Sequence, residues 1–121
     1  MSKINSYKDL LIWQKGIQIA VEVYKITREF PPEEMFGLTN QLRRASNSIS
    51  LNIAEGFGRH TTKSYVNYLV NSRSTLNEVE SGLILAVELK FIEKNKLISL
   101  NNLILEEGKM LGSLINTLLK K

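Results

Sequence analysis

The sequence contains no cysteine and a single histidine among its 121 residues. The first absence excludes a disulfide framework, a thiolate zinc site and a cysteine nucleophile. The second excludes any site built from several imidazole ligands, such as the Glu-x-x-His pairs of a di-iron bundle. A serine-type triad would need His60, and the only acid near it in the sequence is Glu55. We therefore expect no enzyme active site, no metal and no cofactor.

Long apolar runs are missing as well. The longest covers residues 83–87 and is ended by Glu88, whereas a membrane-spanning helix needs roughly 20 apolar residues. The first six residues lack the apolar stretch of a secretory signal. The expectation is a soluble, cytoplasmic protein with neither a membrane partner nor a small-molecule substrate.

Proline occurs only at positions 31 and 32, where it must end the preceding helix. Residues 56–62 form a second break, with two glycines to end one helix and two threonines to cap the next. The charged residues 90–96 form a third. Each of the four segments between these breaks repeats apolar residues with a helical period. The sequence predicts one domain, residues 1–121, which is an all-α, antiparallel up-and-down four-helix bundle.

Each segment carries a main apolar stripe, and the stripes contain, in chain order, Leu10, Trp13, Ile17, Ala20 and Tyr24; Leu38, Leu42, Ala45, Ile49 and Ile53; Tyr65, Leu69, Ser72, Leu76, Val79, Leu83 and Ala86; and Leu97, Leu100, Ile104, Glu107, Leu111, Leu114 and Leu118. The first segment has a second seam of Ile12, Ile19, Val23, Ile26 and Phe30. Its apolar arc, and that of the fourth segment, are wider than a lone bundle requires. The excess predicts a homo-oligomer, and scattered exposed side chains are the alternative.

Three local features lead to narrower expectations. Gly56 or Gly58 should adopt a left-handed backbone conformation that ends the second helix. Glu107 lies on a core stripe and should face a buried partner such as an arginine. The serine- and asparagine-rich residues 46–52 either pack closely against a neighbouring helix or form a plain polar surface, and the sequence favours neither.

The net charge of +4 comes entirely from the middle of the chain. Residues 1–40 and residues 74–121 each carry equal numbers of cations and anions, whereas residues 41–73 carry five cations against Glu55 alone. In a helical hairpin centred between Gly58 and Arg59, Arg44 should lie beside Arg73. The candidate nucleic-acid-binding residues are Arg43, Arg44, Arg59, His60, Lys63 and Arg73.

This basic segment supports two hypotheses about function. The first is a non-enzymatic, oligomeric bundle that binds RNA or DNA phosphates through residues 41–73, without reading the base sequence. The second is a protein-interaction or assembly module in which the arginines form salt bridges with Glu33, Glu34, Glu78 and Glu80 of neighbouring subunits. The exposure of the arginines in the assembled oligomer would discriminate between them.

The order of motifs along the chain resembles a known family, the four-helix-bundle proteins encoded in intervening sequences of bacterial 23S ribosomal RNA genes. These proteins are often grouped as a ribosomal protein family. The most specific block is Asn-Ile-Ala-Glu-Gly-Phe-Gly-Arg at residues 52–59. The residues of this sequence that match the family motif are Trp13, Gln41, Arg44, Asn52, Glu55, Gly56, Gly58 and Arg59. The sequence departs from the usual pattern at residues 47, 50, 51 and 74.

The resemblance implies a four-helix bundle of unknown biochemical role. It also implies a homopentamer, because related members form rings of five subunits. One relative, the accessory protein of diversity-generating retroelements, is basic and associates with nucleic acid and a reverse transcriptase. RNA or DNA is therefore a partner that both the resemblance and the charge pattern suggest.

Overall fold

The structure is a computed structural model, and it describes residues 3–120. Four helices account for most of this part of the chain, and the described residues include no strand. They are α1 (Leu11–Thr27), α2 (Leu38–Phe57), α3 (Thr62–Glu88) and α4 (Ile98–Leu119). Three short 3-10 helices, η1 (Tyr7–Asp9), η2 (Pro32–Glu34) and η3 (Lys94–Leu97), precede α1, α2 and α4 respectively. The prediction of an all-α fold is confirmed.

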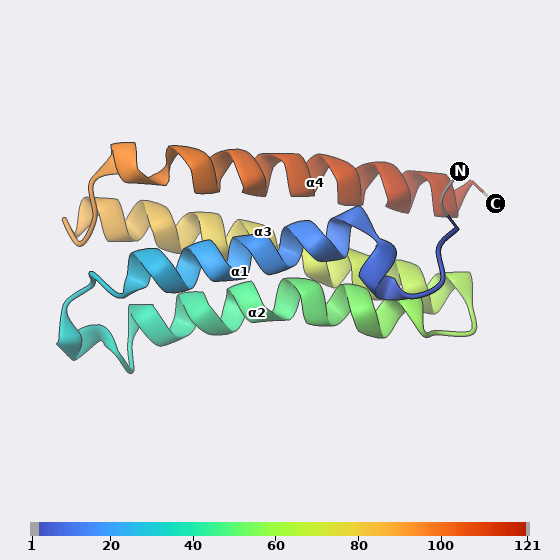
Figure 1. Cartoon of the computed structure of the whole chain (residues 1–121), viewed down its shortest axis with the longest axis horizontal. Helices are drawn as coiled ribbons and strands as arrows, with labels where there is room; N and C mark the ends of the chain where they lie inside the picture. The colour runs from blue at the N-terminus through green and yellow to red at the C-terminus, as the bar shows by residue number, and fades with distance from the viewer. Residues whose placement is uncertain (1–2, 121) are drawn as a thin grey trace.

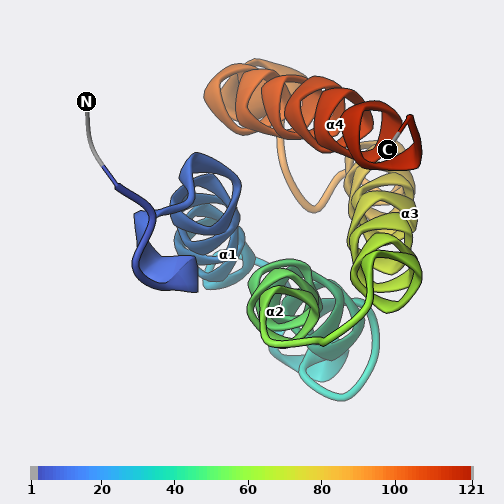
Figure 2. The same ribbon diagram turned by 90° about the vertical axis from the view of Figure 1, so that its right-hand side faces the viewer.

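Successive helices run in opposite directions along one long axis (Figure 1). Viewed down that axis, the helices follow one another in chain order around the bundle (Figure 2). The most extensive packing joins α2 to α3, and α1 contacts both α2 and α4. This arrangement is the up-and-down four-helix bundle that the sequence predicts. None of the described helices is long and apolar enough to cross a membrane.

Side-chain caps fix several helix ends. The Ser6 hydroxyl accepts a hydrogen bond from the Lys8 amide (3.1 Å), and the Asp9 carboxylate reaches back to the Ser6 amide (3.1 Å), which together form a capping box. Glu34 accepts from the Leu38 amide at the start of α2 (3.1 Å). Thr61 accepts from the Ser64 amide at the start of α3 (3.1 Å), so the threonine cap that the sequence predicts is present.

The predicted stripes of α2 and α3 form the core, with Tyr65 half-buried at its edge. In α4 the last buried apolar residue is Ile115, and the predicted Leu114 and Leu118 are half-buried. The main stripe predicted for α1 is wrong. Ile17 is 38% exposed, whereas the second seam supplies the buried residues Ile12, Ile19 and Val23.

Gly16 explains which face of α1 is buried. It lies on the same face as Ile12 and Ile19, and a Cβ built on it would be 3.3 Å from the side chains of Ile49 and Ser50 in α2. Glycine at this position therefore lets α1 approach α2 closely on that face. Glycine is not counted when apolar residues are used to find the buried face of a helix. The hydrophobic pattern therefore predicted the wrong one of the two seams as the buried face of α1.

Candidate nucleic-acid interface

The six candidate basic residues do not form one continuous surface. Arg43 faces α1, where its Nε donates a hydrogen bond to the Thr27 hydroxyl (2.9 Å) and its guanidinium lies 4.8 Å from the centre of the Tyr24 ring. The side chain is half-buried. Arg43 therefore ties α2 to α1 and is not free to hold a phosphate in this conformation.

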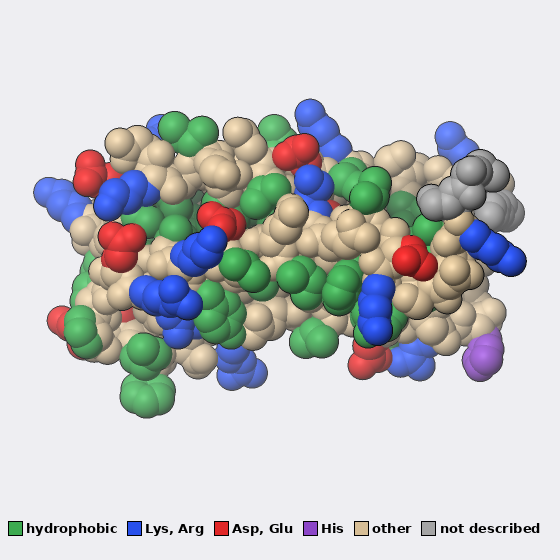
Figure 3. All heavy atoms as spheres, viewed as in Figure 1, with side chains coloured by type: hydrophobic (Ala, Val, Ile, Leu, Met, Phe, Trp, Pro, Cys, Tyr) green, Lys and Arg blue, Asp and Glu red, His purple; other side chains and the backbone are tan. Residues whose placement is uncertain are grey.

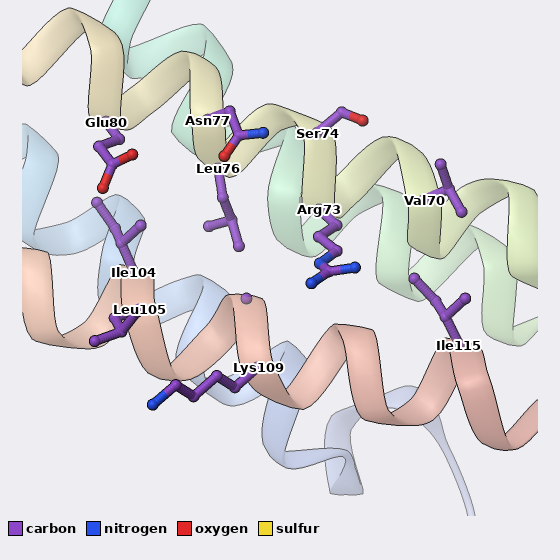
Figure 4. Close-up of a pocket in the computed structure, with 11 residues that line it drawn as sticks. Val70, Arg73, Ser74, Leu76, Asn77, Glu80, Ile104, Leu105, Lys109 and Ile115 are labelled. Carbon is purple, nitrogen blue, oxygen red and sulfur yellow. The ribbon is translucent and has the colours of Figure 1, made fainter.

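Arg44 and Arg73 line different grooves, contrary to the expectation that they lie side by side. Arg44 lines a shallow hollow of about 460 Å³ together with Glu78. Arg73 lies against α4, since a Cβ on Gly112 would be only 2.9 Å from its Nη2. Figure 4 shows the Arg73 side chain reaching from α3 toward α4.

The reason for the difference is the register of the α2–α3 hairpin. Ser72 donates a hydrogen bond to the Ile49 carbonyl (2.9 Å), and Gly56 lies against Tyr65 and Tyr68. The pairs Ile49–Ser72 and Gly56–Tyr65 centre the hairpin between His60 and Thr61, two residues later than the centre predicted from the glycines. A shift of two residues in the centre displaces the partner of Arg44 by four residues, which is about one helical turn.

The turn between α2 and α3 presents Arg59, His60 and Lys63 at the surface. Arg59 is held there by contacts with two residues of the same chain, Glu55 and Tyr68. Its Nη2 lies 3.1 Å from a Glu55 carboxylate oxygen and 2.5 Å from the Tyr68 hydroxyl, and its guanidinium lies 4.8 Å from the centre of the Tyr68 ring. These contacts fix the direction of the arginine and balance part of its charge with Glu55.

The same end of the bundle carries the chain segment before α1 and the C-terminal end of α4 (Figure 1). Five exposed cations belong to these elements and the turn: Lys3, Lys8, Arg59, Lys63 and Lys120. We call this surface, together with His60, the basic end. The single histidine, in purple, marks it at the right of Figure 3.

The formal net charge of the basic end equals that of all the described residues together. Its five cations are opposed by Asp9 and Glu55, and Asp9 is engaged with the amides of Asn5 (2.8 Å) and Ser6 (3.1 Å). At the opposite end, residues 22–44 and 76–98 carry seven cations against eight anions. The bundle is therefore electrostatically polarised along its length, with one cationic end.

Sequence reasoning missed Lys3, Lys8 and Lys120 as members of this surface, because it divided the charge along the chain. The predicted topology was enough to find these lysines. In an up-and-down bundle of four helices, the start of the first helix, the end of the last and the middle turn must share one end. In the predicted bundle, that rule places these lysines at the same end as Arg59 and Lys63.

The family-motif block builds the α2–α3 turn. The Asn52 amide donates to the Ser48 carbonyl (2.8 Å), and Glu55 and Arg59 form the contacts described above. The prediction of a left-handed glycine is wrong, because no glycine among the described residues has a positive φ and Gly58 has a φ of −84°. Gly56 instead lies inside α2, where a Cβ would be 2.7 Å from the Cβ of Tyr68.

The other motif residues are not part of the α2–α3 turn. Trp13 is half-buried and its ring packs edge-on against Tyr7, with 5.3 Å between ring centroids. Gln41 and Arg44 are exposed on α2. The motif therefore combines residues that shape the turn with residues on other faces, and it does not mark one site.

Glu107 is the one carboxyl that is fully buried among the described residues, and the arginine expected beside it is absent. Neither carboxyl oxygen has a hydrogen-bond partner in the described structure. Burial raises the pKa of Glu107 to about 8, and the positive charge of Lys15 acts in the opposite direction. The side chain is therefore a neutral carboxylic acid at pH 7.

The described residues contain no cluster of histidine, aspartate or glutamate that could hold a metal ion. The largest excess of cations lies at the basic end, which offers exposed ammonium and guanidinium groups. Such an arrangement can hold phosphate oxygens by charge.

Comparison with known proteins gives a family and a fold. A solved structure from Bacteroides thetaiotaomicron, a protein of unknown function from the S23 ribosomal protein family, is 27% identical, with a TM-score of 0.77. The match covers 87% of this chain and 98% of that one. No curated protein is significantly similar in sequence. The family model for the 23S rRNA-intervening sequence protein matches residues 8–113. Neither description names an enzymatic activity, and the chain belongs to the family of 23S rRNA-intervening sequence proteins.

Proposed function

We propose that this protein is a non-enzymatic bundle that binds the phosphate backbone of RNA or DNA through its basic end. The observation that carries the proposal is the location of the net charge. Lys3, Lys8, Arg59, Lys63 and Lys120 all belong to one end of the bundle and are exposed. A cluster of exposed cations attracts a polyanion and releases its counterions, which gives affinity without sequence preference.

The aromatic residues near the turn support backbone contact and not base recognition. Tyr68 is half-buried and engaged with Arg59. Tyr65 is half-buried and packs edge-on against Phe57, with 6.3 Å between ring centroids. Because stacking on bases requires a free aromatic face, these side chains offer no platform for unpaired bases. Phosphate contacts alone carry no base information.

Removing two lysines from the basic end should weaken nucleic-acid binding without unfolding the protein. In the double variant Lys63→Gln, Lys120→Gln, we expect the Kd for RNA or DNA to rise about three- to tenfold at 50 mM salt. The slope of log K against log salt should also fall by about 0.7–0.9 for each phosphate that the variant no longer neutralises. Fluorescence anisotropy with two unrelated sequences over a salt series measures both quantities.

A matched control removes the same charge from the opposite end of the bundle. Arg28 and Lys94 are exposed and form no ion pair within the described structure. The variant Arg28→Gln, Lys94→Gln should bind nearly as tightly as the wild type. Equal weakening in both double variants, or no saturable binding by the wild type at 50 mM salt, would rule out the basic end as the interface.

The alternative hypothesis, an assembly module, is supported mainly by Arg73. Arg43 and Arg59 are occupied by contacts within the chain, and Arg44 shares a hollow with Glu78 of the same chain. Arg73 forms no ion pair in the described structure and faces an open groove. Self-association would therefore use Arg73, at a surface away from the basic end.

A further inference from the structure

Arg59 is the one cation of the basic end that forms an ion pair within the described structure. A single nitrogen of its guanidinium makes both of its hydrogen bonds, since Nη2 lies 3.1 Å from Oε2 of Glu55 and 2.5 Å from the Tyr68 hydroxyl oxygen. The other two nitrogens, Nε and Nη1, form no hydrogen bond with any described residue. The contacts within the chain therefore all fall on one corner of the guanidinium.

Nη2 is the nitrogen on which a firm hold on phosphate depends. A guanidinium binds two phosphate oxygens at once through a pair of parallel N–H groups, either from Nη1 and Nη2 or from Nε and Nη2. Both pairs include Nη2, and each uses one of its two hydrogens. Because Glu55 and Tyr68 both accept from Nη2, a phosphate can take single hydrogen bonds from Arg59 in this conformation. It can be held by two parallel hydrogen bonds only after one of these partners leaves.

Glu55 is the easier of the two partners to displace. It lies one helical turn before Arg59 at the end of α2, and its side chain is 60% exposed. Exposed ion pairs of this kind add little to stability, because water solvates both groups well. Tyr68 is half-buried, and both its hydroxyl and its ring contact the guanidinium. Glu55 can therefore turn into solvent while Tyr68 keeps Arg59 in place.

We propose that Glu55 is an autoinhibitory side chain of the basic end, which a nucleic-acid phosphate displaces from Arg59 on binding. This inference rests on the proposed function. Loss of the Glu55–Arg59 pair opposes binding, and the simultaneous contacts of a polyanion with Lys63 and the other exposed cations offset that cost. A single small anion makes no such additional contacts. The pair therefore makes the basic end favour polyanions over single anions.

Removing Glu55 should tighten nucleic-acid binding. Fluorescence anisotropy at about 50 mM salt, with a labelled RNA or DNA of about 20 nucleotides, should give a Kd about three- to tenfold lower for Glu55→Ala than for the wild type. The slope of log K against log salt should steepen by up to about 0.7–0.9, because Arg59 then neutralises a phosphate without releasing a carboxylate. Glu55→Gln keeps the size of the side chain and should act in the same direction. Circular dichroism checks that both variants stay helical.

A matched control and a double-mutant cycle separate this effect from the loss of any negative charge. Glu29 is also 60% exposed and pairs with Lys96 at 3.4 Å, at the opposite end of the bundle, so Glu29→Ala should leave the Kd nearly unchanged. In an Arg59→Gln background, Glu55→Ala should change the Kd by less than about twofold, because no guanidinium is left for Glu55 to mask.

The possible outcomes distinguish this inference from the proposed function. An equal gain from Glu55→Ala with and without Arg59, or no gain at all, would overturn the inference and leave the basic end as a binding surface. Weaker binding by Glu55→Ala would overturn it as well, since Glu55 would then position Arg59 for phosphate. No saturable binding by either the wild type or Glu55→Ala would overturn the proposed function together with this inference.

Discussion

Replacing Glu107 with methionine is expected to stabilise the protein by about 3 kcal/mol at pH 7. The carboxyl is fully buried without a hydrogen-bond partner in the described structure, and burial raises its pKa from 4.5 to about 8. Between these two values the unfolded chain releases the proton and the folded chain keeps it. Glu107 therefore opposes folding increasingly as the pH rises, by about 1.4 kcal/mol per pH unit.

The pKa difference also predicts how the stability gained in Glu107→Met changes with pH. The cost of keeping Glu107 protonated in the folded state is absent below about pH 4.5, grows as the pH rises and levels off above about pH 8. Urea unfolding at pH 5, 6, 7 and 8 and at one protein concentration should show the advantage of Glu107→Met growing across the series.

Two further variants distinguish the effect of the Glu107 carboxyl from the effect of neighbouring groups. Glu107→Gln should remove the same pH dependence with a smaller gain, because its amide is buried without a partner as well. Glu106→Gln changes the exposed neighbour that lies 3.7 Å from Lys15, and it should leave the slope unchanged. If Glu107→Met and the wild type change in parallel from pH 5 to pH 8, Glu107 is ionised in the folded protein and the account is wrong.

Replacing Gly56 with alanine is expected to destabilise the protein by about 2 kcal/mol, although alanine is the better helix former by about 1 kcal/mol. The new Cβ would be 2.7 Å from the Cβ of Tyr68 and 3.0 Å from Cδ1 of Tyr65. A Cβ atom moves only with its backbone, so α2 and α3 would have to separate. Valine at this position should cost more than alanine. Thermal or urea unfolding measures the decrease in stability.

Two other glycines provide internal controls for this effect. Beside Gly58, a Cβ would meet nothing closer than the Glu55 carbonyl at 3.7 Å, so Gly58→Ala should be nearly neutral. At Gly82 the close atom is Cδ2 of Leu42, at 2.6 Å. Because a leucine methyl group can rotate away, Gly82→Ala should cost less than Gly56→Ala. Equal effects at Gly56 and Gly58 would show that close helix packing is not the reason for glycine at position 56.

The sequence was sufficient for the fold because helix breaks and apolar periodicity are local properties. The stripes of α2 and α3 are buried as predicted, apart from the half-buried Tyr65, and Thr61 caps α3. For α1 the hydrophobic pattern failed, since the close contact of Gly16 with α2 decides which face turns inward. The choice depends on the shape of a neighbouring helix, which periodicity within one segment does not report.

The polar residues show the same limit. Of residues 46–52, Ser46 and Ser50 are buried, and the Asn47 amide donates to the Tyr24 hydroxyl (3.0 Å), so close packing was the correct alternative for part of this run. The candidate interface was only partly predictable. The turn residues Arg59, His60 and Lys63 are exposed as a group, but the hairpin register separates Arg44 from Arg73. Register depends on contacts such as Gly56 with Tyr68, which connect the two helices.

The close contact at Gly56 also bears on how the chain folds. Residues Leu38–Glu88 contain α2, the short turn and α3, and this pair has the most extensive packing in the bundle. Joining the two helices closes only a short loop, so the entropy cost of bringing them together is small. The α2–α3 hairpin is therefore the natural folding nucleus, onto which α1 and α4 dock later. Substitutions at Gly56 would then slow folding, whereas substitutions at Glu107 would mainly change the rate of unfolding.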